Sequence, residues 1–406
     1  MTVKKKIFLL AALFYILYII FPLFSDLINI PKWLPSIAAS AIMIILYPKA
    51  FTNKTFYWFW AYIFVLIMYL LLGRPLMIGI GSVADSFKIL IESSYILPTV
   101  GIFCVLYYLN DPNLTKKLVV WSLGILFVSF IVEIPIMQQY ESLRAAYKEE
   151  QQDLQPAVPG LPGYSLMHAY TLFLPVMCHL LKVQSGKWRL FVFVGLIVLC
   201  FVIYDTFVTT SLILMIGILM FTLFYSDKGN TSFLITFSIL SFSLYILYEN
   251  GAFVAIIDWI MPAFTDTPVQ DKLSDFKDSM LQGHITGGSI TGRMDHHAIS
   301  RNAFFENPLF GASTAGGHST LLDRLGGIGL FGTIPFVMIL ISFIQQMAKR
   351  YRTRMSKSFF WVGVIVSFVY LYNKGNWSSE SWLMFLVLMP MGILAFDKGK
   401  SVKGLK

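Results

Sequence analysis

Apolar runs of about 15 to 22 residues recur along the chain, each roughly long enough to cross a hydrocarbon core as an α-helix. A helix also satisfies every backbone polar group inside a membrane. The pattern predicts twelve spans, near residues 7–25, 33–49, 56–72, 95–110, 118–137, 164–181, 190–204, 207–225, 232–249, 326–347, 359–373 and 379–396.

Two long polar segments interrupt these runs, at residues 138–163 and 250–325. The second is far longer than a connector between helices needs to be, and loops of that length are usually functional or disordered. Its own patterning argues against disorder, because residues 291–306 are typical of a helix that ends before Asn307 and Pro308. The predicted domains are therefore a membrane part (1–249), a partly helical loop (250–325), and a second membrane part with a tail (326–406).

Composition agrees with a membrane protein. Of the 406 residues, 57% are hydrophobic and 13% charged, and the mean hydropathy is +0.70, so a soluble domain would lack the polar residues to cover its surface. The expected fold class is an all-α integral membrane protein embedded in a lipid bilayer.

Charge predicts the orientation of the spans. With the amino terminus inside, the predicted spans put 20 of the 31 Lys and Arg residues, but only 3 of the 22 acidic residues, on the inner side. A Lys/Arg bias of this kind follows the positive-inside rule and makes both termini cytoplasmic. The net charge of +9 is thus explained by topology, and a nucleic-acid partner is not expected.

Three short patterns follow one another in and just after the outer loop. They are Gly292-Arg293, the turn Asn307-Pro308-Leu309-Phe310-Gly311, and His318-Ser319 followed by Gly329 and Gly332. In this order and spacing they resemble the signature of the bacterial O-antigen ligase and polysaccharide polymerase superfamily. The resemblance covers about 45 residues closely and the rest of the chain only by its topology.

The resemblance implies a GT-C-like membrane glycosyltransferase of the bacterial plasma membrane. Its donor would be an oligosaccharide on a polyprenyl pyrophosphate, polymerised on the outer face, as for O-antigen, capsule or exopolysaccharide. No cofactor is implied because the donor is already activated. A chain-length regulator and a flippase are further candidate partners.

The residue types fit that chemistry. Loss of a pyrophosphate leaves several negative charges, which preorganised cations stabilise, and the planar guanidinium of Arg binds phosphate oxygens in pairs. The candidate pyrophosphate ligands are Arg293, Arg301, Arg324 and Arg74. The structural alternative is that these arginines pair with nearby carboxylates or with lipid phosphates.

His318 is the candidate catalytic base, with Arg293 as its catalytic partner, because an imidazole can accept the proton of an attacking hydroxyl near neutral pH. The alternative is a histidine that merely precedes a helix capped by Ser319. Glu380 and Trp377 are weaker candidates for binding the acceptor sugar, although Trp is also common at membrane interfaces. A metal site is not expected, since adjacent histidines on a helix point in different directions.

Two other functions remain open. A ligase of the same superfamily would deliver the finished glycan to a lipid core or a protein. The middle-span sequence Val208-Thr209-Thr210-Ser211-Leu212 lacks the arginine of a Ser-Arg pair found in many ligases, which favours the polymerase. A transporter or flippase of lipid-linked sugar is the third possibility, but such proteins usually have broken helices in repeated halves.

Overall fold

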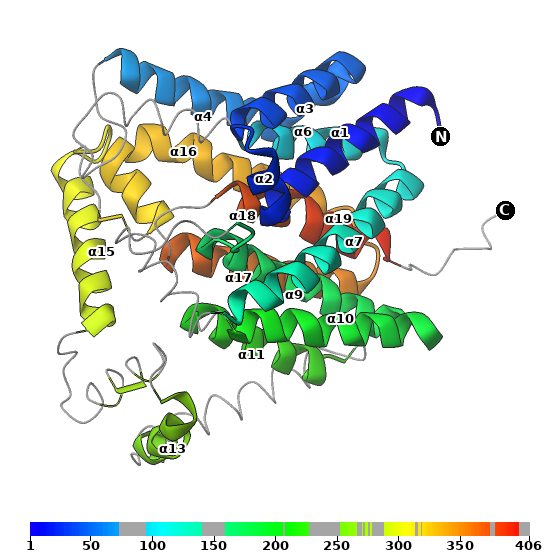
Figure 1. Ribbon diagram of the computed structural model, residues 1–406. Coiled ribbons are helices and arrows are strands. Elements are labelled where there is room, and N and C mark those ends of the chain that lie inside the picture. Colours follow the sequence, from blue (N-terminus) through cyan, green and yellow to red (C-terminus); the bar gives the residue numbers. More distant parts are fainter. Residues whose placement is uncertain are drawn as a thin grey trace.

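The computed structural model describes residues 1–72, 95–139, 159–205, 208–226, 252–265, 270, 273–274, 277, 288–312, 316–317, 319–373 and 378–397, and every regular element among them is helical (Figure 1). In chain order these elements are α1 (Val3–Ile20), α2 (Pro22–Ile28), α3 (Trp33–Leu46), η1 (Pro48–Thr52), α4 (Lys54–Leu71), α6 (Leu97–Leu109), α7 (Pro112–Met137), α9 (Tyr164–Val183), α10 (Gly186–Asp205), α11 (Thr209–Phe224), α13 (Ala252–Ile260), η2 (Met261–Phe264), α15 (Gly288–Glu306), α16 (Thr320–Ala348), α17 (Arg354–Asn373), α18 (Ser379–Leu383), η3 (Met384–Leu388) and α19 (Met389–Ala395).

Six of the described helices are long and apolar enough to cross a membrane: α4, α7, α9, α10, α16 and α17. The bent pair of α1 and α2 makes a seventh if it counts as one span. Four more of the twelve predicted spans correspond to shorter apolar helices, namely α3, α6, α11 and the run from α18 to α19, and the span predicted at 232–249 lies outside the described residues. The chain is an all-α, multi-pass membrane protein.

The first predicted span is broken near its carboxyl end. α1 ends at Ile20, and α2 begins at Pro22 at an angle of 97° to it. Proline has no backbone N–H and is favoured at the first position of a helix, so it ends one helix and starts another. The Ser129 hydroxyl donates a hydrogen bond of 3.0 Å to the carbonyl of Ile20, which stabilises this bend from α7.

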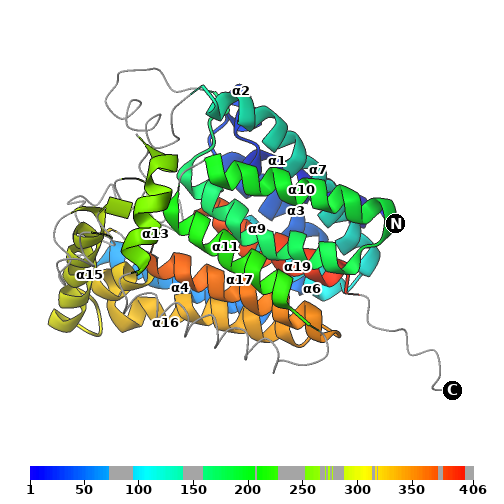
Figure 2. The same ribbon diagram turned by 90° about the horizontal axis from the view of Figure 1, so that it is seen from below.

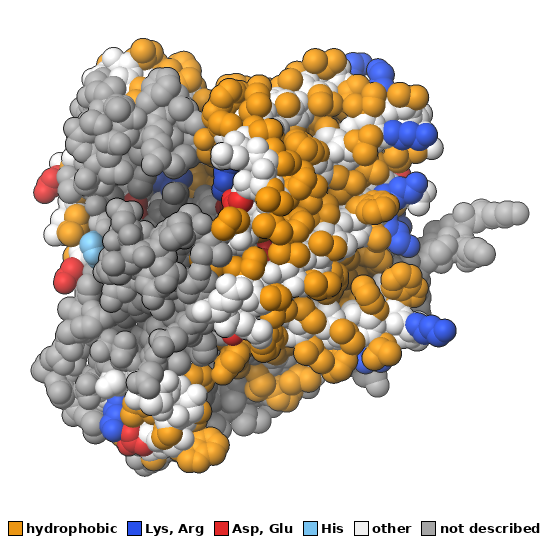
Figure 3. Space-filling model, in the orientation of Figure 1, with side chains coloured by type: hydrophobic (Ala, Val, Ile, Leu, Met, Phe, Trp, Pro, Cys, Tyr) orange, Lys and Arg blue, Asp and Glu red, His pale blue; other side chains and the backbone are white. Residues whose placement is uncertain are grey.

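α9 lies inside the bundle and contacts α10, α11, α17 and α19 (Figure 2). Small residues permit close helix packing around it, as is common in membranes. At Gly392, for example, a Cβ would lie 2.7 Å from Val176 of α9. The outward faces of α1, α4, α7 and α10 carry large exposed apolar side chains, which form the apolar surface seen in Figure 3.

The two ends of the bundle differ in charge. Lys5 near the start of α1 pairs with Asp111 just before α7, at 2.6 Å, and the Thr353 hydroxyl before α17 donates to Asp397 after α19, at 2.7 Å. The chain segments at the start of α1 and the end of α19 therefore lie at one end. Figure 3 shows Lys and Arg side chains gathered there, and we call it the basic end.

The opposite end carries α15, and we call it the loop end (Figure 1). α15 packs against α16 and runs over Gly288–Glu306, so the helix predicted at 291–306 is present and begins three residues earlier. The segment 73–94 lies outside the described residues.

Candidate functional site

The chain re-enters the bundle at the loop end through a turn at residues 307–311 that pairs with a break in α16. The backbone N–H groups of Leu330 and Phe331 donate to the carbonyls of Pro308 and Leu309, at 2.8 and 3.0 Å. The N–H of Ala312 donates to the carbonyl of Gly326 at 2.8 Å. Two of the patterns found in the sequence thus lie side by side and bond through their main chains.

Glycine is required on both sides of this pairing. Gly329 has φ 57° and ψ −164°, a conformation inside α16 that L-residues rarely adopt, and its Cβ would lie 2.5 Å from the carbonyl of Leu309. At Gly311, with φ 73°, a Cβ would lie 2.3 Å from the carbonyl oxygen of Gly327. The span predicted at 326–347 lies within α16, which is long and apolar enough to cross a membrane, but the helix is kinked at Gly329, where it receives the turn (Figure 1).

Tyr69 of α4 holds the pairing from the side. Its buried hydroxyl lies 3.0 Å from the carbonyl oxygen of Phe310 and 2.9 Å from that of Ile328. Both carbonyls lie beside irregular backbone, at the turn and at the kink in α16, and backbone polar groups at membrane depth need hydrogen-bond partners. The tyrosine therefore joins α4, the turn and the break in α16.

Asp323 holds the loop just before α16. Its carboxylate, which is 2% exposed, accepts hydrogen bonds from the Ser300 hydroxyl at 2.6 Å and from the N–H groups of Gly317 and Ser319 at 3.2 and 3.0 Å. The Ser300 hydroxyl in turn accepts from the N–H of Gly316 at 2.8 Å. One buried carboxylate thus fixes residues on both sides of position 318 to α15 and α16.

Ser319 caps α16, whose first residue is Thr320 rather than a residue near Gly326 as predicted. The Ser319 side chain accepts a hydrogen bond from the N–H of Leu322 at 3.2 Å. His318 itself lies outside the described residues, and its catalytic role remains a prediction.

Arg324 lies half-buried on aromatic rings. The centre of its guanidinium is 4.2 Å from the centroid of the Phe336 ring and 5.8 Å from that of Tyr62. Its Nε donates to the Tyr62 hydroxyl at 3.2 Å, and one terminal nitrogen donates to the carbonyl of Thr320 at 3.1 Å. Trp382 extends the group, with its ring centroid 5.8 Å from that of Phe336. We call Tyr62, Phe336 and Trp382 the aromatic seat.

The structure does not pair the described arginines of the site with carboxylates. The ion pairs among the described residues are Lys5 with Asp111, Lys32 with Glu380 and Lys277 with Asp258. Asp323, the carboxylate next to Arg324 in the chain, accepts from backbone and hydroxyl groups. Arg324 is therefore a cation that no carboxylate among the described residues neutralises.

The other predicted arginines have fewer described contacts. Arg301 lies on α15 with its side chain exposed. Arg293 also belongs to α15, two turns earlier, and its side chain lies outside the described residues, as does Arg74. Their predicted contacts with pyrophosphate remain predictions. His297, also on α15, faces α17, with its ring centroid 5.1 Å from that of Tyr372.

Glu380 has a protein partner. Its carboxylate lies 3.3 Å from the ammonium of Lys32, which precedes α3, and its side chain is 10% exposed. The negative charge of Glu380 raises the pKa of Lys32, so the pair is ionised at neutral pH. The weak prediction that Glu380 binds an acceptor sugar must therefore include Lys32, while Trp377 lies outside the described residues.

Two buried polar groups inside the predicted spans were not predicted as site residues. The Glu133 carboxylate of α7, 0% exposed, accepts from the Tyr170 hydroxyl at 2.8 Å and also contacts the Ser129 hydroxyl. On the other side of α9, His168 Nδ1 lies 3.3 Å from the Ser211 hydroxyl, which lies 2.9 Å from the Tyr370 hydroxyl. The sequence signal for the first was an acidic residue inside an apolar run, which is uncommon in membrane spans.

No known family model matches this chain, and no curated protein matches it in sequence. Among the described residues no group of three His, Cys, Asp or Glu side chains could hold a metal ion. The geometry of the described site supports binding of an anion by Arg324 beside a loop whose backbone is fixed by Asp323.

Proposed function

We propose that this protein is a membrane glycosyltransferase that polymerises oligosaccharide repeat units carried on polyprenyl pyrophosphate, on the outer face of the bacterial plasma membrane. The observation that carries the proposal is Arg324. It lies half-buried on the aromatic seat and has no carboxylate partner among the described residues. In the chain it follows the loop segment that Asp323 holds by five residues. Such a cation fits a dianionic leaving group at the membrane surface.

The proposed reaction is one displacement at an anomeric carbon. The acceptor hydroxyl oxygen forms the new glycosidic bond, the bond from that carbon to the pyrophosphate oxygen breaks, and the polyprenyl pyrophosphate leaves with the bonding electrons. His318 takes the hydroxyl proton, and Arg324, Arg293 and Arg301 bind the leaving group. The Asp323 contacts support this assignment because they fix the backbone next to position 318.

The first experiment compares cell-surface glycan in a deletion strain that expresses each variant. We expect His318→Ala, Arg293→Ala and Arg324→Ala to lower chain lengthening by at least about 100-fold, the usual effect of removing one electrostatic contact to a transition state. Arg324→Lys should keep intermediate activity, since the charge remains but the planar fork is lost. The matched control is Arg354→Ala, an exposed arginine at the basic end. Normal polymer from the Arg324→Ala strain at equal membrane expression would remove Arg324 from the mechanism.

The same deletion strain separates polymerase from ligase. Single repeat units on the acceptor indicate a lost polymerase, whereas polymer that accumulates on the carrier lipid indicates a lost ligase.

A transporter of lipid-linked sugar remains a second candidate because broken helices are present, at the junction of α1 and α2 and at Gly329 of α16. Purified protein in detergent micelles, given lipid-linked donor and acceptor, distinguishes the two. A glycosyltransferase forms longer glycan there, whereas a transporter has no second compartment to supply. Absence of product from folded protein under these conditions would favour transport.

A further inference from the structure

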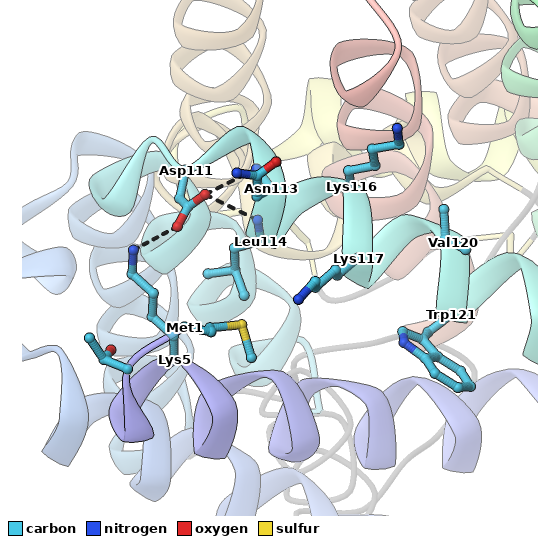
Figure 4. Close-up of a pocket in the computed structure, with 10 residues that line it drawn as sticks. Met1, Lys5, Asp111, Asn113, Leu114, Lys116, Lys117, Val120 and Trp121 are labelled. Carbon is cyan, nitrogen blue, oxygen red and sulfur yellow. Dashed lines mark hydrogen bonds and ion pairs between the residues drawn. The ribbon is translucent and has the colours of Figure 1, made fainter.

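A cavity of about 640 Å³ lies at the basic end between the start of α1 and the start of α7, far along the bundle from the proposed reaction site (Figure 4). Its lining contains three lysines, one aspartate and one tryptophan: Lys5, Lys116, Lys117, Asp111 and Trp121. This volume is in the range of pockets that take small ligands.

The lysines of the cavity are not equivalent. Lys5 is half-buried and paired with Asp111 at 2.6 Å, so the one carboxylate of the lining is already neutralised. Lys116 contributes to the lining, but its ammonium lies 5.7 Å from the ring centroid of Phe396. Lys117 has no carboxylate partner among the described residues, and Figure 4 shows its side chain extending into the space between α7 and α1. The cavity therefore carries unbalanced positive charge.

Toward the middle of the long axis of the bundle, the lining of the cavity is apolar. These apolar side chains face the outside of the bundle. Trp121 and Val120 of α7, which both line the cavity, are 62% and 47% exposed, so this helix presents apolar side chains to lipid just beyond the lysines. A tryptophan next to basic residues at the end of a membrane helix is typical of the level of the lipid headgroups. A ligand in this cavity can thus place a charged group among lysines and an apolar chain along α7.

We propose that this cavity binds the headgroup of an anionic phospholipid, with its phosphate between Lys117 and Lys5 and its acyl chains along the exposed face that includes Trp121. Basic pockets between membrane helices suit such headgroups. The site is independent of the proposed sugar transfer, because it lies at the other end of the bundle and shares no residue with the aromatic seat or the Asp323 contacts.

Native mass spectrometry of the full chain in detergent tests the proposal, with phosphatidylglycerol as the anionic probe and phosphatidylcholine as the neutral one. We expect wild-type protein to bind phosphatidylglycerol more tightly than phosphatidylcholine. Lys117→Ala should weaken phosphatidylglycerol binding about fivefold, the effect of one lysine near a charged lipid surface, and Lys117→Glu should weaken it further. Because Lys117 is exposed, neither change should disturb folding.

Lys187→Ala is the matched control, since Lys187 is an exposed lysine at the same end, on α10, that does not line the cavity. An equal loss of binding in Lys187→Ala and Lys117→Ala would overturn the proposal, because it would reflect net charge alone. Equal affinity for the two lipids would also overturn it. Displacement of phosphatidylglycerol by millimolar inorganic phosphate would reassign the cavity to a free anion and refute the lipid.

Discussion

At the scale of single residues, two kinds of ionisable side chain bear on the proposals. Asp323, Glu133 and Asp111 accept hydrogen bonds from backbone or hydroxyl donors, so each carboxylate stabilises a particular local geometry. Arg324 and Lys117 have no carboxylate partner among the described residues and are available to an external anion. The first kind stabilises the fold, and the second kind marks the places where ligands are proposed.

The pair of Lys5 and Asp111 predicts a pH dependence of stability. The hydrogen bond from Lys5, followed by those from the backbone of α7, lowers the pKa of Asp111. A lowered carboxylate pKa stabilises the folded state above the unfolded pKa of about 3.9, and this contribution disappears as the pH falls through the folded value. We expect Asp111→Ala to cost about 1 to 2 kcal/mol near pH 7, from the lost helix cap and a partly exposed ion pair.

Thermal unfolding in detergent at pH 7 and at pH 3 measures this effect. The difference between wild type and Asp111→Ala should shrink at the lower pH, while Asn113→Ala, at an exposed neighbour in the same turn, should differ little from wild type at either pH. A difference that is equally large at pH 3 would contradict the assignment.

At the scale of elements, the sequence predicted the helices better than it predicted their ends. The run at 33–49 includes Pro48, where the chain leaves α3 for the short helix η1, and the run at 95–110 includes Asn110, which has a positive φ of 45° and ends α6. In both places the predicted span extended beyond the helix into the turn that follows it. The bend at Gly329 escaped prediction for a different reason, since it depends on the turn at 307–311, a non-local partner that periodicity does not reveal.

Replacement of Gly329 tests the pairing of turn and helix. We expect Gly329→Ala to lower stability by at least about 1 to 3 kcal/mol, the usual cost of one strained backbone residue, because the added Cβ also meets Leu309 and Gly311 at 2.5 Å. Gly217→Ala in α11 is the matched control, since a Cβ there meets nothing within 4 Å. Thermal unfolding of both variants gives the comparison, and equal melting temperatures would show that the turn does not depend on this glycine.

At the scale of the whole molecule, charge and polarity are separated along the bundle. The basic end and the loop end were both predictable, because they depend only on which residues lie between apolar runs. The contacts inside the loop end could not be predicted from the sequence. Asp323 accepts from donors on α15 and in the residues before α16, and the aromatic seat combines residues far apart in the chain.

The charge separation predicts that the basic end is cytoplasmic. We expect a membrane-impermeant maleimide to label Glu306→Cys, at the exposed end of α15, in intact cells, and to label Lys187→Cys only after the cells are permeabilised. Cys104, Cys178 and Cys200 are first replaced so that each variant has a single thiol. The reverse labelling pattern would invert the topology and place the proposed reaction on the wrong side.

The aromatic seat also has a consequence for biosynthesis. Tyr62 belongs to α4, near the amino end of the chain, and Trp382 lies close to the carboxyl end. A nascent polypeptide can therefore assemble the complete seat around Arg324 only after its last helices have left the ribosome and entered the bilayer. Truncated translation products that stop before α18 would therefore be inserted in the membrane without a complete seat, and we expect them to lack the proposed activity.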